Sequence, residues 1–258
     1  MPYCELEGQR IHYLEHRDDL RRRHIPLVLV HGAGGSAMHW PPALRRLPDH
    51  DVYALDLPGH GRSQGPGRDD IGAYAEVVHA WAEAIGLAPF VLAGHSMGGA
   101  IALTFALRYP AHLRGLGLVA TGARLKVNPQ ILQGLRSDRE GVGRLLVEWV
   151  HGQRASPAQK RQYLRHFLAV DEDVLLGDWH ACDRFDLRDH LPDIRVPALV
   201  VSGSQDKMTP ATFGQYLAER LPDADLTLIE GGGHMLMLEQ PVLVTQAFAG
   251  FLARLERG

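Results

Sequence analysis

A serine between glycines is the first group in this sequence whose chemistry stands out. The segment Gly94-His95-Ser96-Met97-Gly98 has the G-x-S-x-G spacing, and it joins an apolar run typical of a buried strand to a helical pattern. A strand that turns sharply into a helix forces the turn residue into unfavourable backbone angles, which only small neighbours tolerate. Ser96 is therefore expected to hold its hydroxyl at the tip of a rigid turn, where it can act as a nucleophile. The alternative is a glycine-rich turn that contains a serine by chance.

A serine nucleophile needs a histidine base, and the base needs a carboxylate that orients it. Asp206 and His234 each come at the end of a predicted strand, whereas the strand at 113–122 is followed by no carboxylate. Taken alone, Asp206 could be a turn residue and His234 a polar loop residue, one of 15 histidines in the chain. Their order after Ser96 predicts a catalytic triad of Ser96, Asp206 and His234 for acyl transfer.

The segment HGAGGS (31–36) follows the first long apolar run and has the small residues that let a backbone N–H approach a reacting atom. Acyl transfer passes through a tetrahedral oxyanion, which needs about two hydrogen-bond donors. We assign these donors to the backbone N–H groups of Ala33 and Met97. The segment lacks the glycine register and the lysine of phosphate-binding loops. His31 and His95 are assigned structural or pocket-lining roles and no metal is expected, because no cluster of acidic residues or cysteines accompanies them.

Strands and helices alternate along most of the chain, which favours an α/β architecture with a mostly parallel sheet. Six runs are apolar enough for strands covered on both faces, at 25–32, 51–59, 88–96, 113–122, 196–206 and 224–234. Helical spacing of apolar residues predicts helices over 70–86, 97–109, 210–221 and 241–255. Residues 3–16 predict a hairpin with its turn at Gly8-Gln9, and the charged segment 16–24 is expected to be a solvated turn.

Residues 123–190 interrupt this alternation. They contain no clear strand but have helical patterns at 141–152, 156–170 and 171–186, with Ser156 as an N-cap before Pro157. The segment is too long for a simple crossover and predicts a helical insertion. Its first half is basic, since nine Lys/Arg face three Asp/Glu between residues 124 and 165. This excess favours a solvated helical face, or a docking surface for an acidic carrier protein or an anionic acyl group.

The composition is that of an ordinary globular protein, with 45% hydrophobic and 22% charged residues among 258. The net charge of −3 gives no reason to expect nucleic acid or an anionic membrane as a partner. No apolar run approaches the roughly 20 residues of a membrane span, and the first residues have no signal-peptide pattern, so we expect a cytoplasmic protein. The two cysteines, Cys4 and Cys182, are expected to be free thiols, and no cofactor is expected.

Five motifs in order resemble the α/β-hydrolase fold superfamily, and the resemblance covers nearly the whole chain. They are LVLVHGAGGSAMHW, DLPGHGRS, LAGHSMGGAIAL, VSGSQDKMTP and GGGHMLMLEQP. The chain is most similar to the branch of serine carboxylesterases, lactonases and acyl carrier protein methyl-ester esterases. The resemblance implies an eight-stranded, mostly parallel sheet flanked by helices, with a core of 1–122 and 191–258 and a helical cap at 123–190 after the sixth strand. Dehalogenases and epoxide hydrolases of this fold carry Asp where Ser96 stands, and carbon–carbon bond hydrolases tend to have an aromatic residue where Met235 stands.

The sequence thus predicts a serine hydrolase that cleaves carboxylic ester bonds of small apolar acyl or aryl esters through an acyl-enzyme. Its pocket is expected between cap and sheet. Six apolar or soft residues are candidates for the lining: Trp149, Met208 and Met235, with Phe167, Trp179 and Met237. A lactonase or an acyl carrier protein methyl-ester esterase is the alternative within this branch. A lyase that uses the same base on a proton, or a receptor that binds a small ligand, is the alternative on the same fold.

Overall fold

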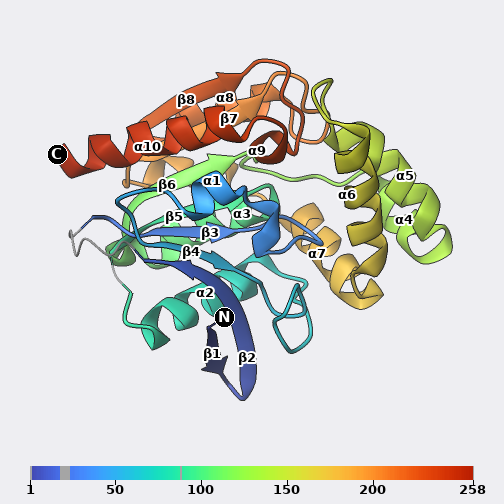
Figure 1. Cartoon of the computed structure of the whole chain (residues 1–258), viewed down its shortest axis with the longest axis horizontal. Coiled ribbons are helices and arrows are strands. Elements are labelled where there is room, and N and C mark those ends of the chain that lie inside the picture. Colours follow the sequence, from blue (N-terminus) through green and yellow to red (C-terminus); the bar gives the residue numbers. More distant parts are fainter. Residues whose placement is uncertain (1, 18–23, 88, 258) are drawn as a thin grey trace.

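Eight strands form one sheet in the order β1-β2-β4-β3-β5-β6-β7-β8 (Figure 1). This computed structural model describes residues 2–17, 24–87 and 89–257, so most of the predicted turn at 16–24 lies outside the described residues. The strands are Tyr3–Leu6 (β1), Gln9–His16 (β2), Leu27–Val30 (β3), Val52–Leu55 (β4), Phe90–His95 (β5), Leu113–Val119 (β6), Ala198–Gly203 (β7) and Ala224–Ile229 (β8). β1, β2 and β4 pair antiparallel, and all other pairs are parallel. The predicted architecture, a mostly parallel eight-stranded sheet flanked by helices, is confirmed.

Two hydrophobic cores cover the two faces of the sheet, because successive side chains of a strand point to opposite faces. In β3, Val28 and Val30 belong to one core, while Leu27 and Leu29 belong to the other. Neither core is exposed to solvent at this strand, since all four residues are fully buried. The apolar runs of the sequence are continuous for this reason.

Ten α-helices are described. They are Pro42–Arg45 (α1), Ile71–Ala84 (α2), Met97–Arg108 (α3), Pro129–Ser137 (α4), Arg139–Val150 (α5), Pro157–Ala169 (α6), Glu172–Arg184 (α7), Ala211–Arg220 (α8), Leu236–Glu239 (α9) and Pro241–Arg257 (α10), with 3-10 turns at Ala37–His39 (η1), Pro110–His112 (η2) and Arg188–Asp193 (η3). Buried residues of α2, α3 and α8 belong to the core on one face, and those of α1, α9 and α10 belong to the core on the other. Helices therefore cover both faces of the sheet.

The first hairpin turns one residue earlier than predicted. Leu6 pairs with Gln9, so the two turn residues are Glu7 and Gly8, with φ of 50° and 78°. A two-residue hairpin of this type requires positive φ at both central positions, and glycine adopts it most easily. The sequence prediction placed Gly8 at the first of the two positions, whereas the structure uses it at the second.

Four helices, α4 to α7, follow β6 and precede β7. Figure 1 shows them together at one end of the molecule, beyond the carboxyl ends of the parallel strands. The N-cap prediction at Ser156 is confirmed, because its hydroxyl accepts the N–H of Gln159 and Pro157 opens α6. Helix α4 was not predicted, since its polar sequence buries only Ile131 and Leu135. We call α4 to α7 the helical insertion.

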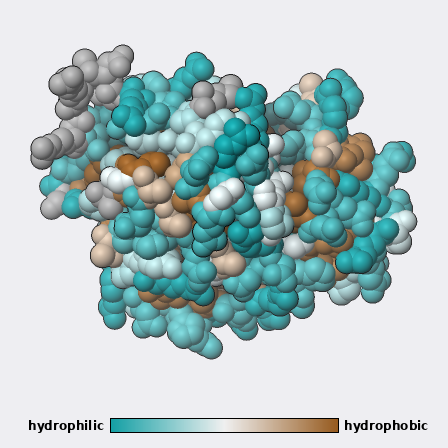
Figure 2. Space-filling model, turned by 90° about the horizontal axis from the view of Figure 1, so that it is seen from below, coloured by the Kyte–Doolittle hydropathy of each residue, from teal (hydrophilic) through white to brown (hydrophobic). Residues whose placement is uncertain are grey.

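The surface agrees with the composition. Figure 2 shows one face that is mostly hydrophilic, with hydrophobic residues in separate patches. Among the described residues, the helices are too short or too polar for one of them to traverse a bilayer. Cys4 and Cys182 are both buried free thiols, as predicted.

Candidate active site

Ser96 occupies the sharp turn between β5 and α3. Its backbone angles are φ 52° and ψ −115°, a combination that is strained for a residue with a side chain. A Cβ on Gly94 would lie 1.9 Å from the carbonyl oxygen of Gly98, and one on Gly98 would lie 2.4 Å from that of Val30. Because backbone atoms block both positions, only glycine fits on either side of the serine.

Two hydrogen bonds hold this turn against the carboxyl end of β6. The Ser96 N–H donates to the Val119 carbonyl at 2.9 Å, and the Thr121 hydroxyl donates to the Ser96 carbonyl at 2.8 Å. Thr121 follows the strand at which the sequence offered no carboxylate. It contributes a brace for the turn instead of an acid.

The imidazole of His234 lies against the carboxylate of Asp206, with 2.9 Å between Nδ1 and Oδ2. The N–H groups of Met208 and Thr209 donate to Oδ1 at 2.8 and 2.9 Å, and the Thr209 hydroxyl donates to Oδ2 at 2.8 Å. Burial by itself would raise the pKa of Asp206, but His234 and the Thr209 hydrogen bonds outweigh it and lower this pKa. An ionised carboxylate accepts hydrogen bonds only, so it keeps the proton of His234 on Nδ1 and leaves Nε2 free to accept one.

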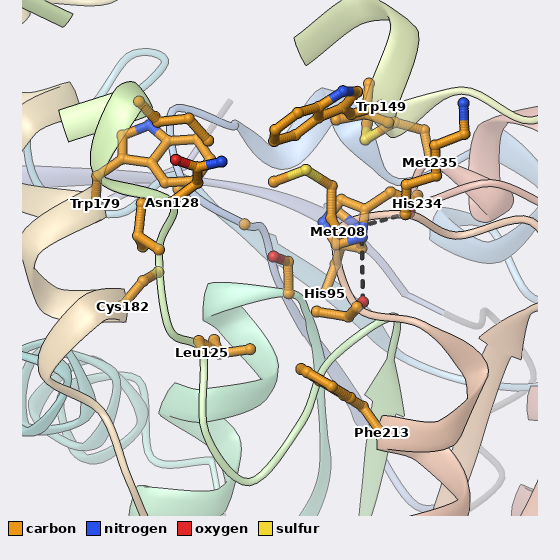
Figure 3. A pocket seen from close by; sticks show the side chains of 18 of the residues that line it. His95, Leu125, Asn128, Trp149, Trp179, Cys182, Met208, Phe213, His234 and Met235 are labelled. Carbon is orange, nitrogen blue, oxygen red and sulfur yellow. Dashed lines mark hydrogen bonds between the residues drawn. The ribbon is translucent and has the colours of Figure 1, made fainter. Parts of the chain in front are cut away.

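Ser96 and His234 line one cavity of about 200 Å³ between the sheet and the helical insertion (Figure 3). Trp149, Met208 and Met235, which the sequence suggested as pocket residues, also line it. Trp179 does so as well, whereas Phe167 and Met237 do not belong to its lining. Sequence reasoning missed the wall formed by Leu125, Val127, Asn128, Ile131, Cys182 and Phe213.

In Figure 3, Asn128, Trp179 and Cys182 lie on the side of the cavity away from His234. The side-chain oxygen of Asn128 caps α4 by accepting the N–H of Gln130 at 2.9 Å. The Cys182 thiol is buried, and burial raises its pKa. This side of the cavity therefore combines the apolar surfaces of Trp179 and Cys182 with the amide of Asn128.

The loop 31–36 passes beside Ser96. A Cβ on Gly32 would lie 3.1 Å from the Ser96 Cβ, and Gly32 and Ala33 both line the cavity. The carbonyl of Gly32 accepts the N–H of Gly35 at 3.0 Å and Nδ1–H of His31 at 2.8 Å. The backbone N–H groups predicted as oxyanion donors, those of Ala33 and Met97, have no acceptor within the described ranges.

His31 and His95, two other histidines beside this loop, have structural contacts. His31 donates from Nδ1 and accepts the Leu57 N–H at Nε2, at 3.1 Å. Burial holds its pKa well below the ordinary value, and the nearby His60 adds to this effect. His95 donates from Nε2 to the His234 carbonyl at 2.9 Å, and burial likewise depresses its pKa. These contacts agree with the structural or pocket-lining roles expected from the sequence.

Two side-chain clusters elsewhere in the described residues bring three possible metal ligands within 4.8 Å of one another: His24, His50 and Glu256, and His79, Glu83 and His112. None of these six residues lines the cavity with Ser96.

The segment DLPGHGRS (56–63) braces the loop at 31–36 at both of its ends, since the Leu57 N–H donates to His31 and Asp56 holds Ala37. Asp56 accepts the Ala37 N–H at 2.7 Å, the Arg62 N–H at 2.9 Å and Nδ1–H of His12 at 2.8 Å. A Cβ on Gly61 would lie 2.3 Å from the Asp56 carboxylate, so glycine is required there. The segment is therefore structural and does not reach the cavity lining.

The sequence between residues 27 and 247 matches the sequence model of the alpha/beta hydrolase family. The chain is 36% identical to the dihydrolipoyllysine-residue acetyltransferase component of an acetoin cleaving system from Pseudomonas putida, over 89% of this chain and 64% of that protein, so it spans less than two thirds of that relative. It is 31% identical to a pimeloyl-[acyl-carrier protein] methyl ester esterase from Neisseria meningitidis, over 86% of this chain and 89% of the relative.

A solved structure of a thermophilic esterase superposes with a TM-score of 0.85 at 32% identity, over 98% of this chain and 97% of that one. The fold, the serine on its turn and these matches agree. The chain belongs to the alpha/beta hydrolase family.

Proposed function

We propose that this protein is a serine hydrolase that cleaves carboxylic ester bonds through a Ser96–His234–Asp206 triad. The observation that carries the proposal is the arrangement at the cavity. An ionised carboxylate fixes the tautomer of His234, and this imidazole lines the same cavity as a serine held on a strained turn. Nucleophilic acyl transfer requires a base with a free Nε2 and a hydroxyl that share one cavity.

In the proposed reaction, His234 takes the proton of Ser96 as the hydroxyl oxygen attacks the ester carbonyl. The N–H groups of Ala33 and Met97 donate to the resulting oxyanion. The collapse of this intermediate breaks the bond to the leaving alcohol, which receives its proton from His234, and leaves the acyl group on Ser96. Water then attacks the acyl-enzyme with the same histidine as base, which releases the acid and restores the serine.

The cavity supports small substrates with apolar acyl or aryl groups. Its volume of about 200 Å³ is below the roughly 300–1,000 Å³ of sites for drug-sized ligands. Its lining is formed mainly by aliphatic, aromatic and sulfur-containing side chains, among them Leu125, Ile131, Trp179 and Cys182. We place the helical cap at residues 123–190, since α4 to α7 and the segment that leads into α4 supply these residues.

A lactone or a carrier-linked methyl ester is an alternative substrate of the same site. The esterase relative from N. meningitidis is named for an acyl carrier protein substrate. Several basic residues between 124 and 165 form ion pairs, such as Lys126 with Asp183 at 2.8 Å and Lys160 with Glu148 at 3.4 Å. Four others are exposed without an ion pair in the described part of the chain: Arg136, Arg154, Arg161 and Arg165. A carrier-linked substrate would lose activity with rising salt, whereas a small ester would not.

A hydrolysis screen across acyl lengths, lactones and thioesters tests the proposal, with Ser96→Ala as the comparison. We expect sustained turnover of a short-chain p-nitrophenyl ester and a loss of about 10⁶ in kcat in the variant. A protein that a fluorophosphonate labels, but that hydrolyses only one ester molecule per protein, would instead favour a receptor. Turnover that survives in Ser96→Ala would favour a lyase or other chemistry.

A further inference from the structure

A carboxylate of the helical insertion is buried against the loop at 31–36. Asp178, on α7, is fully buried. Its Oδ2 accepts the N–H of Gly34 at 2.7 Å and lies 2.8 Å from Nε2 of His60, while Oδ1 accepts the hydroxyl of Tyr74 at 2.6 Å. A buried carboxylate is tolerated only where donors replace its water, and here three separate segments of the chain supply them.

His60 completes an ion pair with Asp178. Its Nδ1 lies 3.0 Å from the Pro58 carbonyl, which can only accept, so Nδ1 carries a proton. Its Nε2 faces the carboxylate, and a proton on this atom as well makes the ring a cation. Burial would lower the pKa of His60, but the attraction and hydrogen bond of Asp178 outweigh burial and raise it. Gly34 therefore donates to a charged acceptor, and such bonds are roughly twice as strong as neutral ones.

The hydrogen bond from Gly34 to Asp178 fixes one of the two peptide groups that flank Ala33. The other is fixed by the bonds from Gly35 and His31 to the Gly32 carbonyl, which lies in the same planar peptide group as the Ala33 N–H. Gly34 has φ 60°, and a Cβ there would lie 2.7 Å from a methyl group of Leu175, one turn before Asp178. The loop is thus held between its own hydrogen bonds and α7.

We propose that Asp178 is a positioning residue: it holds Gly34 so that the Ala33 N–H points at the oxyanion. The proposal rests on the proposed function, because it needs an oxyanion at Ala33. It gives the helical insertion a second role beside covering the substrate. The insertion also completes the donor geometry of the core loop, and Asp178 acts through Gly34 without touching the substrate.

The test is the rate at which an alkyl fluorophosphonate modifies Ser96, followed by mass spectrometry of the modified peptide. The phosphoryl oxygen of this reagent takes the place of the ester oxyanion, so its reaction depends on the same donors. Four proteins are compared with the wild type: Asp178→Ala, Asp178→Asn, Tyr74→Phe and Ser96→Ala. Tyr74→Phe is the matched control, because it removes one bond from the same carboxylate but leaves the bond to Gly34.

Asp178→Ala should slow the modification about 10²-fold, the typical loss of one oxyanion donor. Asp178→Asn should recover about one of these two decades and remain about tenfold slow, since its amide oxygen is a neutral acceptor. Tyr74→Phe should react within twofold of the wild type even if its melting temperature falls. The pH dependence of the rate should be the same in all of these proteins, since Asp206 and His234 are untouched.

Equal rates for Asp178→Asn and Tyr74→Phe would overturn the inference, and this comparison decides the matter even if Asp178→Ala does not fold. A shifted pH dependence in the Asp178 variants would also overturn it, because the damage would then extend to His234. If the wild type is not modified at Ser96, or if Ser96→Ala is modified equally, the proposed function fails first and the role of Asp178 falls with it.

Discussion

Replacing Asp206 by asparagine should inactivate the protein by reversing the tautomer of His234. Oδ1 of Asp206 accepts two backbone N–H groups, those of Met208 at 2.8 Å and Thr209 at 2.9 Å. In Asp206→Asn the amide oxygen must stay on these donors, because the NH₂ group cannot accept them. The NH₂ group then takes the place of Oδ2, which lies 2.9 Å from Nδ1 of His234. It donates to Nδ1, so the ring proton moves to Nε2 and the base can no longer accept the proton of Ser96.

The expected loss is about 10⁴ in kcat, which is the effect of a wrong tautomer in such a triad. Since one decade in rate is about 1.36 kcal/mol, this loss is about 5.4 kcal/mol of transition-state stabilisation. The assay is the steady-state hydrolysis of a short-chain p-nitrophenyl ester, with circular dichroism to verify that the variant is folded. KM should change little, because Asp206 does not touch the substrate.

Asp225→Asn is a matched control. Asp225 lies on β8 with a side chain 60% exposed, and its carboxylate pairs with Arg254 at 3.4 Å. This variant should keep kcat within twofold, because an exposed ion pair contributes little. A folded Asp206→Asn with kcat within tenfold of the wild type would refute the reasoning, since the tautomer would then not depend on Asp206.

Three further predictions concern the turn, the buried ion pair and the cavity. Gly94→Ala should destabilise the protein by about 3 kcal/mol or more in urea unfolding, because its Cβ would meet the Gly98 carbonyl at 1.9 Å. Gly250→Ala is the control: its Cβ would have no atom within 4 Å, and it should stabilise the protein by about 0.5–1 kcal/mol. Equal effects of the two substitutions on the free energy of unfolding would contradict the account of the turn. The raised pKa of His60 predicts that the ion pair stabilises the folded protein fully below about pH 6.5 and that this stabilisation is lost as the pH rises through the raised value. The fall in melting temperature between about pH 6.5 and 9 should therefore be smaller in Asp178→Asn than in the wild type. Parallel curves of melting temperature against pH for the two proteins would disprove this. Trp149→Ala should raise kcat/KM for longer acyl esters relative to acetate, because it removes an indole from the cavity wall, and an unchanged chain-length profile would place the acyl group elsewhere.

Local patterns in the sequence were sufficient to predict the sheet and to select the catalytic candidates. The unbroken apolar run of β3 indicates a strand covered on both faces, and the glycines around Ser96 indicate a turn with no room for side chains at these positions. Each of these features is set by residues within a few positions of one another. For the same reason Asp206 and His234 could be selected from their places at strand ends.

Features that depend on long-range packing were not accessible in this way. The bond between Asp178 and Gly34 joins residues 144 positions apart, and neither residue belongs to a pattern that indicates the other. Helix α4 buries only Ile131 and Leu135, and two apolar positions are too few to identify a helix from its apolar spacing. The wall at 125–131 was missed with it.

Trapping the covalent intermediate tests the central claim most directly. The protein is mixed with an excess of a short-chain p-nitrophenyl ester, quenched in acid during turnover, digested and analysed by mass spectrometry. We predict an acyl group on the peptide that contains Ser96, located on this serine by fragmentation, together with a burst of about one p-nitrophenol per protein when deacylation is the slower step. Acylation at another residue during sustained turnover, with Ser96 unmodified and Ser96→Ala fully active, would contradict the account.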